Sequence, residues 1–153
     1  MTVETNAGLL ILNINNDDIV KVDMCMPNFE PSKIPLNLNQ LSSEYCVEGH
    51  MIGSLSIGNP HAILIQDEIN DIDVIASKLQ SSDLFPEGVN VGFMKVLNKN
   101  EIQLRVVERG VGETHACGSG ACAAVIHGVR QGLLSSKVIV HLNGGDATVE
   151  FDG

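Results

Sequence analysis

The chain has 153 residues, of which 44% are hydrophobic and only 3% aromatic, and its formal net charge is −10. A chain of this length can bury the core of one domain without disulfides. With 9 Lys and Arg against 19 Asp and Glu, neither a nucleic acid nor an anionic membrane is expected as a partner.

The first apolar stretch, within residues 1–16, has no basic segment before it and is interrupted by Asn. It predicts neither a signal peptide nor a membrane span, so we expect a cytoplasmic protein. The cysteines lack the paired spacing of a zinc ribbon or a thioredoxin motif, and reduced thiols are expected.

The N-terminal part predicts a hairpin followed by extended chain. Residues 9–14 and 19–24 are β-rich runs, and the turn-forming residues Asn15, Asn16, Asp17 and Asp18 separate them. Residues 27–39 contain three prolines, which predict an extended connection and not a helix.

The central part predicts two strands and a surface helix. Residues 51–57 and 62–66 have strand composition and flank the polar turn GNPH at 58–61. Residues 71–80 carry apolar side chains at helical spacing, which predicts an amphipathic helix on the outside of the fold.

Two further hairpins are predicted on either side of an apolar helix. Their strands are residues 91–97 with 102–107 and residues 138–142 with 148–151. Between them, residues 117–132 are apolar on nearly every face and end at Gly132, a helix C-cap.

An all-round apolar helix must be surrounded by protein. The predicted fold is therefore α/β of the α+β type: a curved, mostly antiparallel, barrel-like sheet around one central apolar helix, with a second helix packed outside. The small residues Ala121, Ala123, Ala124 and Gly128 are expected to let strands approach the helix axis.

The start of the central helix, CGSG at 117–120, is the first candidate site. Free N–H groups at a helix N-terminus favour anions, so the amides of Gly118 and Ser119 are expected to hold a substrate carboxylate. The same field is expected to let Cys117 ionise more readily than a free cysteine. The alternative is that Cys117 is a small buried hydrophobe and the glycines only permit packing.

Other chemistries are less well supported. A metal site made of His115, Cys117, Cys122 and His127 is not expected, because positions 117, 122 and 127 do not share one helix face.

Five polar residues elsewhere are candidates to converge on Cys117; they are Asn59, His61, Asn90, Glu108 and Arg109.

Four segments together identify a family resemblance: ERGVGETHACGSGACAA at 108–124, SIGNPHAI at 56–63, PEGVNVGFM at 86–94 and PNFEP at 27–31. The chain resembles diaminopimelate epimerase over essentially its whole length. The resemblance implies a cofactor-independent isomerase of lysine and peptidoglycan biosynthesis that interconverts LL- and meso-diaminopimelate. It implies that two cysteines transfer protons on opposite faces of one carbon.

The resemblance also implies residue roles. Cys117 is one catalytic thiol, and Glu108 and His61 set thiol protonation and contact the substrate amine. Gly118 and Ser119 bind the α-carboxylate by their amides. The resemblance implies that the distal amino-acid end of the substrate is bound by Asn59, Asn90 and Arg109.

The family's other catalytic cysteine lies in a glycine-flanked motif of an N-terminal domain, and no such motif precedes residue 117 here. The resemblance therefore implies that residues 1–24 form a hairpin near the domain boundary. Residues 25–153 correspond to the C-terminal domain, cut shortly before its terminal strands. The missing N-terminal domain is the expected partner, and the chain alone is expected to be inactive.

Two alternatives stay open on sequence alone. A proline racemase or hydroxyproline epimerase resembles this plan, but shows Asp-Arg and Pro-Cys where this chain has Glu108-Arg109 and Ala116-Cys117. The second alternative is a catalytically silent domain that binds carboxylates weakly or only folds. In addition, loss of the N-terminal domain is expected to uncover apolar surface, through which the chain is expected to form a homo-oligomer.

Overall fold

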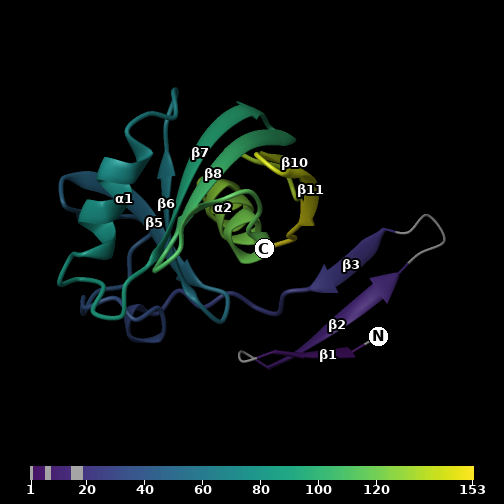
Figure 1. Ribbon diagram of the computed structural model, residues 1–153, viewed down its shortest axis with the longest axis horizontal. Coiled ribbons are helices and arrows are strands. Elements are labelled where there is room, and N and C mark those ends of the chain that lie inside the picture. Colours follow the sequence, from purple (N-terminus) through teal and green to yellow (C-terminus); the bar gives the residue numbers. More distant parts are fainter. Residues whose placement is uncertain (1, 6–7, 15–18) are drawn as a thin grey trace.

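The computed structural model describes residues 2–5, 8–14 and 19–153, which form two sheets and two α-helices (Figure 1). A three-stranded antiparallel sheet has the order β1-β2-β3. Its strands are β1 (Thr2–Thr5), β2 (Gly8–Ile14) and β3 (Val20–Asp23). The predicted hairpin is confirmed as β2 and β3, while β1 was not foreseen; the predicted turn at 15–18 lies outside the described residues.

The larger sheet has eight strands in the order β11-β10-β8-β7-β6-β5-β4, with β9 paired to β8. Its strands are β4 (Tyr45–Val47), β5 (His50–Ser56), β6 (Pro60–Ile65), β7 (Asn90–Asn98), β8 (Glu101–Glu108), β9 (Gly112–Thr114), β10 (Lys137–Leu142) and β11 (Gly145–Glu150). Two pairs, β6 with β7 and β8 with β10, are parallel. The prediction of a mostly antiparallel sheet is therefore confirmed.

Each face of this sheet packs against one helix. Helix α2 (Gly118–Arg130) lies inside the curve of the sheet, and α1 (Ile72–Gln80) lies on the outer face (Figure 1). Successive side chains of β7 and β8 point to opposite faces of the sheet, as strand geometry requires. The inner cluster includes Met94 and Leu104, packed around α2, while the outer cluster includes Phe93 and Val107, packed around α1.

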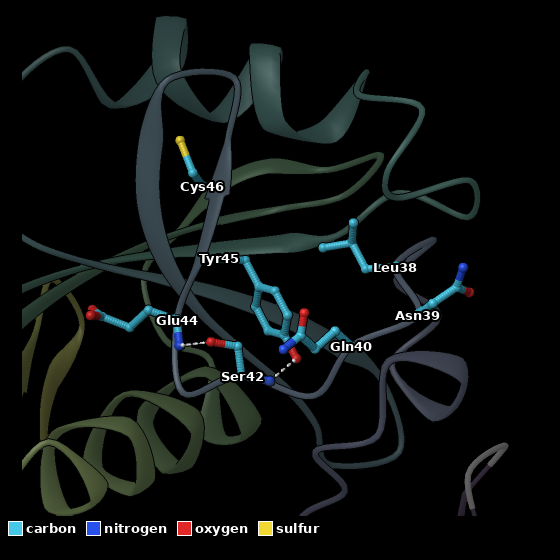
Figure 2. Close-up of a pocket in the computed structure, with 7 residues that line it drawn as sticks. All are labelled: Leu38, Asn39, Gln40, Ser42, Glu44, Tyr45 and Cys46. Atoms are coloured by element: carbon cyan, nitrogen blue, oxygen red, sulfur yellow. Dashed lines mark hydrogen bonds between the residues drawn. The ribbon is translucent and has the colours of Figure 1, made fainter.

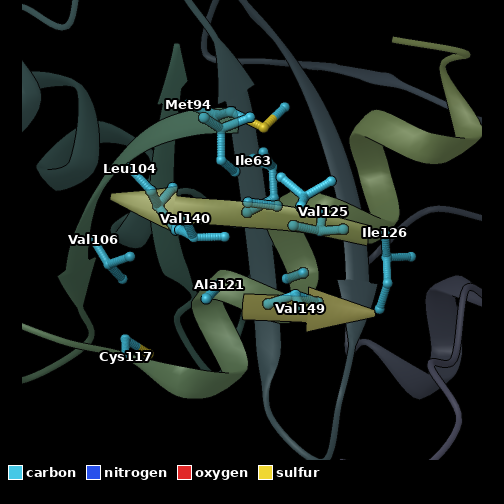
Figure 3. Packing of buried hydrophobic residues seen from close by; sticks show 14 of the residues in the cluster. Ile63, Met94, Leu104, Val106, Cys117, Ala121, Val125, Ile126, Val140 and Val149 are labelled. Atoms are coloured by element: carbon cyan, nitrogen blue, oxygen red, sulfur yellow. The ribbon is translucent and has the colours of Figure 1, made fainter. Parts of the chain in front are cut away.

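Helix α2 is buried along most of its length, as its composition predicted. Figure 3 shows Ala121, Val125 and Ile126 of this helix among the strands of the inner cluster. Its C-cap is Gln131, so Gly132 stands one residue beyond the predicted position, at φ +73°, where glycine is favoured.

Two local predictions differ from the structure. The proline-rich segment contains one turn of 3-10 helix, Pro31–Lys33, because proline at the first helical position needs no N–H partner. The strand predicted from residue 51 is the second arm of a hairpin with β4. Its two-residue turn, Glu48 and Gly49, has positive φ at both positions, and glutamate is an unusual residue there.

The three-stranded sheet carries exposed apolar side chains and contacts the larger sheet through an ion pair. Lys21 of β3 forms an exposed ion pair of 2.9 Å with Glu150 of β11. Apolar side chains on its strands are half exposed, with Ile11 at 54%, Ile14 at 56% and Val20 at 50%. No helix among the described residues is both long and apolar enough to span a membrane.

Candidate active site at the start of helix α2

Cys117 occupies the N-cap of α2, with an extended backbone at φ −142° and ψ 104°. Its sulfur accepts a hydrogen bond from the N–H of Gly120 at 3.4 Å, and its carbonyl accepts from the N–H of Ala121 at 2.9 Å. The side chain is 8% exposed and lies at the edge of the inner cluster near Val106 (Figure 3). A buried thiol thus begins the helix.

The two glycines that follow Cys117 have different surroundings. A Cβ on Gly118 would meet no atom within 4 Å, whereas a Cβ on Gly120 would lie 3.1 Å from Val106 and 3.2 Å from the Cys117 sulfur. Packing therefore explains Gly120 but not Gly118. Within the described chain, the N–H groups of Gly118 and Ser119 have no acceptor, so they are available to an anion.

The expectation that Cys117 ionises readily is wrong for this chain. Burial raises the pKa of the thiol above its ordinary value of 9.0, and the negative field of Glu108 acts in the same direction. The hydroxyl of Ser119 and the N–H of Gly120 oppose this effect without overcoming it. The thiol is therefore protonated at neutral pH.

His61 and Asn59 connect to Cys117 through a chain of polar contacts. The Nε2 atom of His61 lies 3.0 Å from Oδ1 of Asn59, and Nδ2 of Asn59 donates to Oγ of Ser119 at 3.3 Å. The Ser119 Oγ in turn lies 3.6 Å from the Cys117 sulfur. Four predicted site residues are thus brought together from the β5–β6 turn, β6 and the start of α2.

His61 is fully buried, and burial lowers its pKa to about 4. The ring is therefore neutral at physiological pH. Its Nδ1 atom has no hydrogen-bond partner within the described part of the chain. Buried ring nitrogens without a partner are uncommon, and Nε2 of His127 is a second one among the described residues.

The other three predicted residues lie at the same edge of the sheet. Asn90 begins β7 directly beside His61, and its Oδ1 accepts from the N–H of Arg109 at 3.0 Å. Glu108 ends β8, and its Oε1 accepts from Oγ1 of Thr114 at 2.7 Å. The guanidinium of Arg109 donates to the carbonyl of Glu87 at 2.6 Å and is exposed.

Topology explains this convergence. Strands β6 and β7 are parallel and β8 runs against them, so the first residues of β6 and β7 meet the last residues of β8. Sequence reasoning missed Thr114 as the partner of Glu108, since a lone threonine in a polar loop carries no distinctive signal. It named Ser119 for its amide and missed the contact of its hydroxyl.

Two other features are separate from this site. An open hollow of about 390 Å³ is lined by residues 38–40, 42 and 44–46 (Figure 2), none of which is a predicted site residue. Within the described ranges, no cluster of three or more His, Cys, Asp or Glu side chains is placed to hold a metal ion.

Comparison with known proteins assigns the family. Residues 53–153 match the diaminopimelate epimerase family. The chain is 52% identical over 153 residues to the diaminopimelate epimerase of Vesicomyosocius okutanii subsp. Calyptogena okutanii (strain HA). That alignment covers 99% of this chain and 56% of the relative, so the chain spans about half of the relative's length.

Solved structures show the same fold at low sequence identity. A hydroxyproline epimerase from Agrobacterium vitis with bound trans-4-OH-L-proline has a TM-score of 0.64 at 14% identity, covering 99% of this chain and 50% of that one. A phenazine biosynthesis protein of the PhzF family from Enterococcus faecalis has a TM-score of 0.50 at 16% identity, covering 62% of this chain and 35% of that one. Because residues 53–153 match the family and the identity to a member is 52%, the chain belongs to the diaminopimelate epimerase family.

Proposed function

We propose that this chain carries one half of the active site of a cofactor-independent epimerase that interconverts LL- and meso-diaminopimelate. The observation that carries the proposal is the start of α2, where a buried thiol stands beside two unpaired amides and an open Gly118. Membership of the family supplies the substrate class.

The amides of Gly118 and Ser119 bind the α-carboxylate of the substrate in this proposal. When the α-proton leaves, negative charge spreads onto the carboxylate oxygens, and fixed N–H donors stabilise that charge. The absence of a side chain at Gly118 lets the carboxylate approach the backbone. The helix start thus serves both as a binding site and as an oxyanion site.

Cys117 is proposed to transfer the proton on one face of the α-carbon. A thiolate on one face accepts the α-proton while a thiol on the other face donates a proton, and the configuration inverts. In this chain alone the raised pKa keeps Cys117 in the thiol form, the proton donor. Glu108 and His61 are proposed to adjust that protonation and to contact the substrate amine.

Asn59, Asn90 and Arg109 are proposed to bind the distal amino-acid end. Asn90 uses its carbonyl oxygen for the Arg109 backbone and keeps its amide N–H groups for a ligand. Arg109 is anchored to Glu87 through one nitrogen, and its remaining guanidinium donors are suited to a carboxylate.

The second acid/base group is proposed to come from a polypeptide equivalent to the part of the relative that this chain does not match. Cys25 and Cys46 are exposed and belong to the junction after β3 and to β4. Cys122 lies in the same helix as Cys117 and packs against the inner cluster, so it is not on an opposite face of any bound ligand. The chain by itself is expected not to epimerise.

The test follows exchange of the α-proton of diaminopimelate in D2O by NMR. The chain alone should give no exchange. Mixing it with a polypeptide containing the remainder of the 52%-identical relative should restore exchange. Cys117→Ala should abolish the restored activity, and Cys122→Ala, a matched control in the same helix, should retain it.

Turnover by the chain alone, or restored activity that survives Cys117→Ala, would contradict the proposal. A mixture that binds diaminopimelate but never exchanges its α-proton would instead support a silent carboxylate-binding domain.

A further inference from the structure

The polar contacts that lead from His61 to Cys117 have a defined direction. A carbonyl oxygen only accepts, so Nε2 of His61 must donate to Oδ1 of Asn59 across 3.0 Å. The neutral ring then carries its single proton on Nε2. This agrees with Nδ1, which is buried and has no acceptor in the described residues.

The same direction continues through Ser119. Asn59 donates from Nδ2 to Oγ of Ser119, which occupies one lone pair of that oxygen and turns the hydroxyl proton elsewhere. The Cys117 sulfur, 3.6 Å from Oγ, is the acceptor within reach, and sulfur accepts at such distances. In this arrangement the chain of three contacts ends with the Ser119 hydroxyl as donor and the Cys117 sulfur as acceptor.

The groups around the sulfur act in opposite directions. Glu108, on β8, opposes negative charge on Cys117, as does burial itself. Burial, together with the charge of Cys117, raises the pKa of Cys122 on α2 to about 11, so the Cys122 thiol stays neutral. Only the Ser119 hydroxyl and the Gly120 N–H favour the thiolate.

We propose that Ser119 is a positioning residue whose hydroxyl donates a hydrogen bond to the sulfur of Cys117 and so stabilises the thiolate. Asn59, held in turn by His61, keeps that hydroxyl in the donating orientation. This role is distinct from the binding of substrate by the Ser119 amide. Its importance for catalysis rests on the proposed function, but the hydrogen-bond chain is a property of this chain alone.

The test measures the rate of alkylation of each cysteine by iodoacetamide between pH 7 and pH 10.5, with peptide mass spectrometry to separate the sites. Ser119→Ala should raise the pH midpoint for Cys117. At pH 8 its rate should fall about three- to tenfold, because loss of thiolate outweighs the higher reactivity of a more basic thiolate. Above the midpoint the rate should not fall.

Ser119→Thr keeps the hydroxyl and should keep the wild-type profile. Cys46, which is exposed on β4, is read in the same samples as the internal reference for the reagent and should react alike in both variants, while far-UV circular dichroism checks folding. An unshifted midpoint in Ser119→Ala would overturn the proposal, because it would show that the Ser119 hydroxyl does not stabilise the thiolate. A rate lowered equally at every pH would also overturn it, as the mark of a structural effect.

The role of Asn59 is tested by non-additivity. Asn59→Ala should raise the Cys117 midpoint by less than Ser119→Ala does, and should add nothing in the Ser119→Ala background. An equal shift in both backgrounds would show that Asn59 does not act through Ser119. Because these assays need no substrate, failure to restore epimerase activity would not affect their outcome.

Discussion

Each end of α2 has a glycine, and the protein uses the two glycines in opposite ways. At the open end, residues 117–119, a Cβ on Gly118 would meet nothing within 4 Å. At the packed end, His127 and Gly128, the space is filled: the His127 ring stands against Gly53, and Leu134 covers Gly128. Small residues thus leave room for a ligand at one end and for the protein itself at the other.

The comparison separates function from stability along one helix. Contacts at the packed end are made on folding, so changes there should lower the free energy of unfolding. Gly118 at the open end is exposed and its N–H has no acceptor among the described residues, so a change at Gly118 should leave folding almost untouched.

Gly53→Ala should strongly destabilise the packed end. The new Cβ would overlap the ring of His127, which is buried, so the ring or the strand would have to shift. Overpacking of this kind costs about 3 kcal/mol. Urea denaturation measures the loss, and His127→Ala in the same chain should recover part of it. A variant as stable as the wild type would show that the two elements are not held this closely.

Lowering the pH from 7 to 5 should destabilise the fold through two buried histidines. Burial lowers the pKa of both His127 and His61 to about 4, from the ordinary 6.5. The unfolded state binds more protons between these values, so the stability present above pH 6.5 is lost as the pH falls towards 4. Each histidine should cost about 2 kcal/mol at pH 5.

Glu44 lies 3.8 Å from Nε2 of His127, but desolvation prevails over this carboxylate and the pair is not ionic at neutral pH. His127→Gln should therefore reduce the acid-dependent loss by about half, measured by urea denaturation at pH 7 and pH 5. An unchanged pH dependence in this variant would show that His127 titrates normally.

The smallest effects should distinguish two glycines of α2 directly. Gly128→Ala places a Cβ against the side chain of Leu134 and should lower the free energy of unfolding by about 1–2 kcal/mol. The higher helix propensity of alanine offsets only part of this clash. Gly118→Ala should change the free energy of unfolding by less than about 0.5 kcal/mol. Equal losses in the two variants would contradict the division between the ends.

Much of the fold follows from local sequence. Periodicity of two predicted the hairpin strands, and helical spacing and all-round apolarity placed α1 outside and α2 inside. The short strands β1, β4 and β9 escaped notice, because three or four residues carry too little pattern. The turn at Glu48 and Gly49 was also missed, because glutamate rarely adopts positive φ.

The candidate site was predicted as a set of residues but not as an arrangement. Sequence motifs pointed to Asn59, His61, Asn90 and Glu108, and strand topology then placed them at one edge near Cys117. The predicted direction of the Cys117 pKa shift was wrong, because a helix start can be recognised in sequence whereas the desolvation of a thiol cannot.

The elements, the apolar central helix and the chemical types at its start follow from the sequence, because they depend on neighbours along the chain. Which glycine is open, which is packed and which side chains connect His61 to Cys117 emerge only in the folded chain. So does the degree to which burial opposes ionisation of the thiol. Those properties depend on atoms contributed by distant strands, and their positions are set when the sheet curves around α2.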